Sequence, residues 1–440
     1  MMRVKGMRDF DADMMKRKDM IISKAEETFS SFNFKKIDTP VLEYFDTLTK
    51  EGSGGEEIEK QTYNFYDFSK RRVGLRYDLT VPLARYLSQN TNFSIPQKLQ
   101  RTGKVWRYED TKKGRYREFS QCDIDIIGST DTSADAQILF CAYYALKNIG
   151  LTEFTFSINN RKLTDGILNH LKIDESIKIG VMRTIDKIDK LSREKLHKEF
   201  EKYNIQKTQA DKILSSFEIK GPIKDAIKII KNKVSFEKNN IAEEGIKELE
   251  ELSEYLEAYG ISNTCECNLC IVRGLDYYTG CVFETTINRE KKLGSICSGG
   301  RYDKMLGHFM NKEVPCTGIS IGVDRLLDYF ISKRKEDETQ KMNKNAIFIA
   351  NADAEYKGKS KQLAAKLRKI LKSKNTIIET EITERKLANQ IKYADREKIR
   401  YLIIVGKDID EAKKVTLKDL EKHTEMQINA NLKDIEKLIK

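Results

Sequence analysis

Arginines on strand-like segments are the residues of this sequence whose type and placement best fit a chemical role. The positive charge of the chain comes mostly from lysine, yet several segments with strand character carry arginine instead. A guanidinium holds a phosphate or carboxylate through two parallel hydrogen bonds, which an ammonium cannot do. Any one of these arginines could equally form a surface ion pair, but several on strands that also carry acids predict an anion-binding cleft. The arginines are Arg107, Arg115, Arg273, Arg301 and Arg325.

The acids are clearest in the segment FSQCDIDIIG (119–128). Strand alternation places Phe119, Gln121, Asp123 and Asp125 on one face and the apolar residues on the other. A strand of this kind either has one solvated face or lines a polar pocket, and the pattern leaves both open.

The segment GLRYDLTV (74–81) carries an acid in a similar pattern. Thr80 followed by Pro82 is also typical of a helix start with Thr80 as the N-cap. As a strand, the segment has two faces, one with Leu75, Tyr77 and Leu79 and the other with Arg76, Asp78 and Thr80.

The sequence lacks the motifs of several other common kinds of catalytic and metal site. The sequence contains no GxxxxGK[ST], HExxH or GxSxG segment, and its four histidines lie far apart. The cluster CECNLC holds Cys265, Cys267 and Cys270, but a structural zinc site usually needs a second pair of ligands. We therefore expect no zinc and predict no metal-ligating residues.

The composition limits the class of protein. A chain of 440 residues predicts two or three domains. The net charge of +12 fits either a polyanionic partner or a general bias towards lysine. The scattered cysteines are typical of reduced thiols, and neither a signal peptide nor an apolar run of membrane-spanning length is present. We expect a cytoplasmic protein without a membrane segment.

The periodicity predicts the elements that must position these residues. Residues 13–32 have helical spacing, and KVWRYED and FSQCDIDIIG predict an antiparallel hairpin around a basic loop. GISIGVDRLLDYF predicts a strand that turns at Gly322 into a helix. We predict a first part of the core at 1–160, a helical insertion at 161–262, a second part of the core at 263–332, a polar linker at 333–344 and a small α/β domain at 345–440.

Several of these segments together resemble class II aminoacyl-tRNA synthetases, and in particular the histidyl-tRNA synthetases. KIDTPVLEY, with Pro40, resembles motif 1, KVWRYED with GRYREFSQCDIDIIG resembles motif 2, and GISIGVDRL resembles motif 3. VRGLDYYTG and SGGRYDKML resemble the two signatures of the histidine-specific family, and KGMRDF and RKLANQIKYADREK also resemble it.

The resemblance implies an α+β fold. It consists of an antiparallel sheet flanked by helices, a helical insertion and a C-terminal α/β anticodon-binding domain. The implied reaction has two steps, in which L-histidine and ATP form histidyl-adenylate and the histidyl group then moves to the 3′ end of tRNA(His). ATP would bring Mg²⁺, and the protein would be a homodimer. A catalytically inactive histidine-sensing or tRNA-binding paralogue of the same fold is the alternative.

The resemblance also implies roles for individual residues. Arg107, Arg273 and Arg325 would be catalytic. ATP would be bound by Arg107 at the α-phosphate, Glu109 near the adenine, Phe119 stacked on it and Arg325 at the terminal phosphates. The histidine pocket would comprise Asp78, Leu79, Thr80, Arg107, Gln121, Asp125, Arg273, Tyr277, Tyr278 and Tyr302, and the tRNA acceptor end would meet Lys112, Lys113, Arg115 and Arg117.

Overall fold

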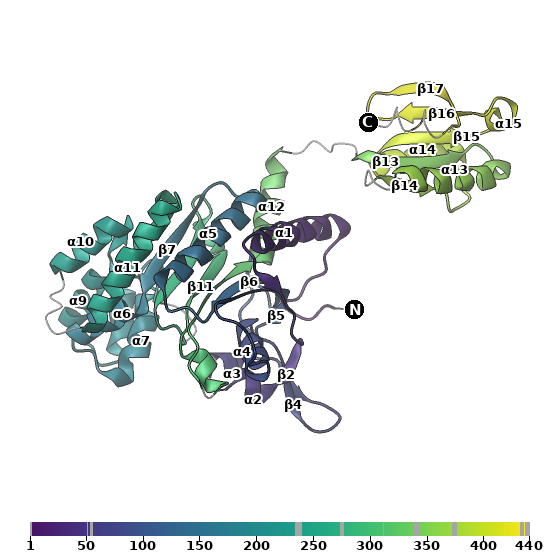
Figure 1. Ribbon diagram of the computed structural model, residues 1–440. Helices are drawn as coiled ribbons and strands as arrows, with labels where there is room; N and C mark the ends of the chain where they lie inside the picture. The colour runs from purple at the N-terminus through teal and green to yellow at the C-terminus, as the bar shows by residue number, and fades with distance from the viewer. Residues whose placement is uncertain are drawn as a thin grey trace. The chain divides into compact units, whose positions relative to one another are not determined.

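The structure is a computed structural model that divides into two compact units, Met1–Ser332 and Lys333–Lys440. Each unit combines helices with a sheet and is described here by itself (Figure 1). The described residues are 2–50, 52, 56–233, 240–272, 277–310, 312–337, 343–371, 376–431 and 435.

The first unit is built on a nine-stranded sheet with the order β1-β5-β6-β12-β11-β10-β7-β9-β8. Neighbouring strands are antiparallel except for the pairs β1–β5 and β7–β9, as the predicted antiparallel sheet requires. The strands are β1 (Lys35–Lys36), β5 (Gln97–Trp106), β6 (Glu118–Ile127), β7 (Phe154–Asn160), β8 (Lys220–Gly221), β9 (Cys265–Asn268), β10 (Cys281–Ile287), β11 (Cys297–Arg301) and β12 (Cys316–Gly322).

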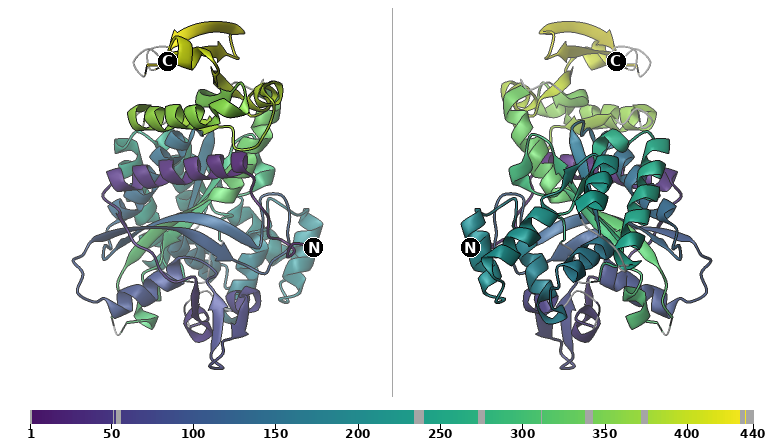
Figure 2. Two further views of the ribbon diagram at one scale, coloured as in Figure 1. Left: turned by 90° about the vertical axis from the view of Figure 1, so that its right-hand side faces the viewer. Right: turned by 90° about the vertical axis from the view of Figure 1, so that its left-hand side faces the viewer.

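Three long helices cover one face of this sheet (Figures 1 and 2). They are α1 (Ala12–Ser31), α5 (Thr132–Ile149) and α11 (Asn240–Ala258), and α5 packs against both of the others. Apolar side chains of these helices share one hydrophobic core with Cys122, Ile124 and Ile126 of β6. The polar side chains of β6 are therefore left on the opposite face of the sheet, as the strand alternation predicts.

A second group of elements lies at that opposite face. A separate hydrophobic core joins α4 (Thr80–Gln89) and the short helix η3 (Met305–His308) to Leu99 and Ile127 of the large sheet. Beside α4 lies a small sheet with the order β2-β4-β3. Its strands are β2 (Leu42–Tyr44), β3 (Asn64–Tyr66) and β4 (Arg72–Leu75), accompanied by α2 (Phe45–Leu48) and α3 (Glu56–Gln61).

The lysine-rich segment between β7 and β9 is largely helical. Its first helix begins at Arg161, directly after β7, and shares the core of the large sheet through Leu163 and Ile167. The helices are α6 (Arg161–His170), α7 (Glu175–Ile185), α8 (Arg193–Glu201), α9 (Lys207–Phe217), α10 (Ile223–Lys233) and α11, followed by the short helix η1 (Ser262–Thr264).

The chain turns from β12 into α12 (Val323–Asp337) at Gly322, as predicted. The helix continues into the segment predicted to be a linker. Its lysine, arginine and glutamate residues are good helix formers, and it contains neither glycine nor proline. The short helix η2 (Lys291–Leu293) completes the first unit. Across the described part of the chain, none of the helices has both the length and the apolar composition needed to cross a membrane.

The second unit contains the predicted alternation of strands and helices around a sheet with the order β14-β13-β15-β16-β17. The first three of these strands are parallel and the last two are antiparallel. The elements are β13 (Asn343–Asn351), η4 (Ala354–Tyr356), α13 (Lys357–Ile370), β14 (Ile377–Thr380), α14 (Leu387–Arg396), β15 (Ile399–Val405), α15 (Asp408–Glu411), β16 (Lys414–Asp419) and β17 (Thr424–Asn429).

Candidate active site

Buried acids and amides line the inner face of β6. Gln121, Asp123 and Asp125 follow one another on that face, and each is at most 9% exposed. Gln121 Nε2 donates a hydrogen bond to Ser320 Oγ at 2.6 Å on the neighbouring strand β12. This arrangement decides between the two interpretations of the alternating pattern, because a solvated face would leave these side chains in water.

Asp125 is held between two strong donors. The Arg101 guanidinium donates to its Oδ2 and the Tyr302 hydroxyl donates to its Oδ1. Across the sheet Gly318 pairs with Asp125, and a Cβ atom at position 318 would lie 2.0 Å from Oδ1. The glycine therefore makes room for the carboxylate on this face.

Asp78 lies at the start of α4 rather than on a strand. Its Oδ1 accepts hydrogen bonds from Thr80 N at 3.0 Å and Val81 N at 2.9 Å, so it satisfies free amides at the helix start. The predicted strand through residue 80 is wrong beyond Leu75, where β4 ends, and Thr80 is the first helical residue rather than the N-cap. Leu79 is buried beside it.

Three tyrosines enclose the space near these acids. The ring centroid of Tyr277 lies 4.8 Å from that of Tyr278 and 5.7 Å from that of Tyr302. Burial raises the pKa of the Tyr278 hydroxyl, and the charges of Asp125, Asp78 and Asp123 also raise it. The Tyr278 hydroxyl therefore lies near the carboxylates of both acidic segments, Asp78 in one and Asp123 and Asp125 in the other.

Several buried acceptors of the pocket lack a partner within the part of the chain that the structure describes. Asp78 Oδ2, Gln121 Oε1 and Asp123 Oδ1 have no hydrogen-bond partner among the described residues. Unpaired buried acceptors are unfavourable in a folded protein unless a ligand or water satisfies them. Two carboxylates and an amide oxygen in this state suit a cationic donor such as an ammonium group.

A group of guanidiniums lies beside the acidic pocket. Arg107 Nε donates to Tyr77 O at 3.1 Å, and its guanidinium carbon lies 4.3 Å from the Tyr77 ring centroid and 5.2 Å from that of Phe119. Burial lowers the pKa of Arg325, and the charges of Arg115 and Arg107 lower it further. Arg115 and Arg107 thus both repel the Arg325 guanidinium, and an anion bound beside these cations would be favoured.

The backbone and one acid hold these cations in place. Arg325 Nε donates to Gly114 O at 2.9 Å, and its Nη1 donates to Ser295 O. Glu109 pairs with Arg115. Next to this pair a hollow of ≈ 340 Å³ is lined by Gln61, Tyr108, Glu109, Asp110, Arg115 and Arg117.

The basic loop between β5 and β6 contains a tight turn. Lys112 N donates to Arg115 O at 3.1 Å and Arg115 N donates to Lys112 O at 2.8 Å. Lys112 and Lys113 are exposed, whereas Arg117 Nε donates to Glu109 O at 3.1 Å and its guanidinium stacks on Tyr108 at 3.9 Å. The four residues predicted to meet tRNA therefore divide into two solvated lysines and two arginines that border the hollow.

One of the predicted arginines is held in a buried ion pair. The prediction that Arg301 lines the anion cleft is wrong, because its Nε donates to Asp135 Oδ2 at 3.0 Å in a buried pair. Burial of Asp135 raises its pKa to about 6, although the charge of Arg301 opposes the rise. Arg273 lies outside the described residues.

Sequence reasoning missed two groups in this pocket. Arg101 is 2% exposed and pairs with Asp125, yet it stands on β5 with no neighbouring motif to single it out. The strand alternation places Asp123 on the pocket face of β6, but no motif assigns it a role. Burial raises its pKa to about 7, although the charge of Arg101 opposes the rise. The available signal was the pairing of β5 with β6, which sets Arg101 opposite Asp123.

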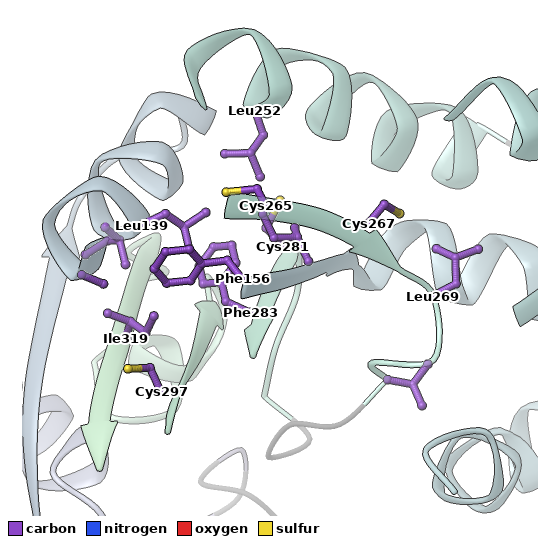
Figure 3. Close-up of a cluster of buried hydrophobic side chains, with 14 of the residues drawn as sticks. Leu139, Phe156, Leu252, Cys265, Cys267, Leu269, Cys281, Phe283, Cys297 and Ile319 are labelled. Atoms are coloured by element: carbon purple, nitrogen blue, oxygen red, sulfur yellow. The ribbon is translucent and has the colours of Figure 1, made fainter. Parts of the chain in front are cut away.

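The cysteines of CECNLC belong to the hydrophobic interior. Cys265 and Cys267 lie on β9 among buried side chains that include Phe156 and Leu269 (Figure 3). Cys270 Sγ donates to Phe217 O at 3.2 Å. No group of three or more His, Cys, Asp or Glu side chains that could hold a metal is found within the described ranges.

Comparison with known proteins agrees with this geometry. Residues 6–326 match the family model for histidyl-tRNA synthetase, and residues 344–440 match the model for an anticodon binding domain. The histidine–tRNA ligase of Clostridium tetani is 36% identical, with 97% of this chain and 96% of the relative covered. That of Finegoldia magna is 37% identical, with 96% and 95% covered.

The structure has a close counterpart as well. The crystal structure of histidyl-tRNA synthetase from Nostoc sp. PCC 7120 superposes with a TM-score of 0.83 at 28% identity, and covers 100% of this chain and 98% of that one. The sequence matches and this superposition extend across both units. The chain belongs to the histidyl-tRNA synthetase family.

Proposed function

We propose that this chain ligates histidine to tRNA(His) in two steps, with both steps at the site built on β6. The observation that carries the assignment of the site is the acidic, tyrosine-lined pocket beside the guanidiniums of Arg107, Arg115 and Arg325. Histidine brings a cationic ammonium and an imidazole, and ATP brings a polyanionic chain. A site for their reaction needs acids and guanidiniums next to each other.

The histidine pocket has two ends. Asp78, Thr80 and Gln121 hold the α-ammonium, which is supported by the unpaired Oδ2 and Oε1 atoms. Asp125 and Tyr278 meet the imidazole. The remaining residues of the pocket wall are Leu79, Tyr277 and Tyr302.

The nucleotide lies along the guanidiniums. Arg107 holds the α-phosphate, Phe119 stacks on the adenine and Glu109 lies near its edge. The hollow beside Glu109 and the position of Arg107 between the Tyr77 and Phe119 rings support this placement. Arg325 grips the terminal phosphates.

The chemical step depends on the placement of charge. The histidine carboxylate attacks the α-phosphorus in line, the bond to the β-phosphate bridging oxygen breaks, and pyrophosphate leaves. Negative charge grows on the α-phosphoryl oxygens, and fixed guanidiniums there stabilise it without a nucleophilic side chain. We assign this role to Arg107 and to Arg273.

Mg²⁺ would accompany ATP. The ion needs only one or two protein carboxylates when phosphates supply other ligands. Glu109 and Glu284 both act on the pKa of Arg325, which places two carboxylates near the guanidiniums and fits this requirement. They would hold the ion, which neutralises phosphate charge when bound.

The remaining parts of the chain would serve tRNA binding and assembly. Lys112, Lys113, Arg115 and Arg117 meet the acceptor end, and residues 345–440 read the anticodon. Residues 161–262 are an insertion into a core formed by 1–160 and 263–332, with 333–344 as the connection. The protein would act in the cytoplasm.

A homodimer is supported by exposed apolar side chains on the small sheet. The side chains cluster on β2, β3 and their flanks, where large apolar surface marks a contact site. Val41 is 40% exposed, Leu42 41%, Tyr44 52%, Phe65 48% and Tyr66 68%. The motif 1 segment contributes three of them.

The first test is ATP–pyrophosphate exchange with each amino acid in turn, followed by charging of tRNA. Exchange that depends on histidine alone, together with charging of tRNA(His), is the expected result. Histidine binding without any exchange would favour the inactive histidine-sensing paralogue.

A further inference from the structure

The segment before α1 lies against the basic loop of the site. Gly6 O accepts a hydrogen bond from Arg117 N at 2.8 Å. Gly6 has φ +84°, and a Cβ atom there would lie 2.6 Å from Arg117 Cγ and 2.7 Å from Thr111 Cγ2. The contact therefore has no space for a larger residue, and the N-terminal segment follows the loop closely.

Two residues farther on, Arg8 bridges two acids of α12. Its Nη1 donates to Asp328 Oδ1 at 2.6 Å and its Nη2 donates to Asp324 Oδ1 at 2.9 Å. The same guanidinium lies 3.9 Å from the ring centroid of Tyr116. Asp324 and Asp328 are one helical turn apart, so without a cation their like charges would repel.

The other oxygens of these acids hold the loop, and Lys18 Nζ also lies 3.5 Å from Asp324 Oδ2. Asp328 Oδ2 accepts from Gly114 N at 3.1 Å and from Tyr116 Oη at 2.7 Å. Asp324 Oδ2 accepts from Ser120 N at 2.6 Å. Because Arg325 Nε donates to Gly114 O, α12 holds Gly114 by both its N–H and its carbonyl.

We propose that Arg8 is a positioning residue for ATP activation, which acts through Asp324 and Asp328 and does not touch the substrate. By bridging and orienting both carboxylates, it fixes the loop against α12 and so sets the spacing of the Arg115 and Arg325 guanidiniums. The proposal rests on the function proposed above. The N-terminal segment would then contribute to catalysis without contacting the nucleotide.

The fork of the guanidinium is essential to this role. Each of its two Nη atoms serves a different carboxylate. A lysine at position 8 would keep the charge but could not reproduce this paired geometry. Arg8→Lys is therefore expected to retain part of the function that Arg8→Ala loses.

The test compares Arg8→Ala and Arg8→Lys with Arg3→Ala in pyrophosphate exchange. Arg3 lies in the same segment, and its side chain is 61% exposed in a surface pair with Asp9. Arg8→Ala is expected to lower kcat about tenfold to a hundredfold, since small misplacements of catalytic groups have effects of this size. KM for ATP should rise, KM for histidine should stay constant, and Arg3→Ala should match the wild type.

Hydrogen exchange on the full chain without substrate provides a readout independent of activity. In Arg8→Ala the amides of Gly114 and Ser120 should exchange faster than in the wild type. Unchanged protection of these amides, or an equal rise in both KM values, would overturn the proposal. If Arg8→Ala does not fold, Arg8→Lys and Asp328→Asn must show the same changes to a smaller degree. A wild type without exchange activity would refute the proposed function, while the amide protection would still decide the role of Arg8.

Discussion

At the scale of single residues, the site is defined by buried polar atoms that have no partner among the residues that the structure describes. Each oxygen of Asp125 already accepts from one protein donor, Arg101 or Tyr302, whereas Asp78 and Gln121 each have one buried oxygen without a partner in the described structure. A buried acceptor of this kind discriminates strongly between ligands that can and cannot donate to it. The unpaired oxygens therefore favour a ligand that carries a hydrogen-bond donor such as the ammonium group of an amino acid.

Arg273 provides the sharpest test of the catalytic assignment. Both Arg273→Ala and Arg273→Lys are expected to reduce histidine-dependent pyrophosphate exchange by about 10²–10³-fold, because one preorganised charge donor is worth that much. Lysine would supply the charge but not the bidentate fork. The histidine concentration at half-maximal rate should change little.

Arg289→Lys is the matched control for this substitution. Its side chain is 79% exposed and pairs with Glu153 at the surface, so exchange should proceed at the wild-type rate. Near-normal turnover in Arg273→Lys would show that the arginine has no bidentate role in the reaction.

Asp123 predicts a pH dependence of stability. Its folded pKa is raised to about 7 by burial, above the ordinary value, so the folded state keeps a proton that the unfolded state has released. The stability that this group contributes is present at low pH and is lost as the pH rises through about 7. Asp123→Asn cannot ionise and should escape that loss.

The check is the unfolding free energy of the first unit at about pH 5 and about pH 8. The gain of Asp123→Asn over the wild type should be larger at the higher pH by at least about 1 kcal/mol, since one pKa unit corresponds to about 1.4 kcal/mol. Asp9→Asn, which removes an exposed carboxylate, is the control. A gain that is equal at both pH values would mean that Asp123 is ionised in the folded protein.

At the scale of elements, the loop between β5 and β6 divides into two functional halves. Arg115 and Arg117 border the hollow beside Glu109, whereas Lys112 and Lys113 extend into solvent. We propose that Arg115 and Arg117 contact the nucleotide in addition to the acceptor end of tRNA, whereas the two lysines contact tRNA alone.

The double variant Lys112→Ala/Lys113→Ala should slow transfer to tRNA and leave pyrophosphate exchange unchanged. Each lost phosphate contact should reduce the slope of log affinity for tRNA against log salt by about one. Arg117→Ala is the contrasting variant and should impair exchange as well, because Arg117 donates to Glu109 O. Equal loss of exchange in both variants would place the lysines at the nucleotide instead.

At the scale of the whole molecule, each unit has its own hydrophobic core. Two clusters fill the second unit on the two sides of its sheet, and neither includes a residue of the first. We therefore propose that the units fold separately, with activation in the first and tRNA recognition in the second.

Deletion of residues 343–440 should leave part of the pyrophosphate exchange and reduce tRNA charging by at least about tenfold, the effect of losing about 1.4 kcal/mol of binding. The melting temperature of the remaining unit shows whether it is folded. Normal charging by the truncated protein would assign another role to the second unit, and loss of both activities would indicate that it supports the first.

Local patterns in the sequence predicted several secondary-structure elements of this protein and the side chains that share one face of them. The two-residue period of β6 predicted which side chains share the pocket face, and the turn at Gly322 predicted the strand and helix that carry Arg325. The alternation of strands and helices from β13 to β15 in the second unit was predicted from periodicity in the same way, but the antiparallel strands β16 and β17 were not. These features depend on neighbours in the chain, so the sequence reports them directly.

Only the tertiary structure decided how the charges pair. Arg101 meets Asp125, Arg301 meets Asp135 instead of an anion, and Arg8 meets Asp324 at a separation of 316 residues. Of the strand and the helix start that the sequence allowed at Thr80, the helix start forms, and the Asp78 carboxylate accepts from the first free amides of α4. Such pairings depend on strand register and on packing between distant segments, and no local period encodes them.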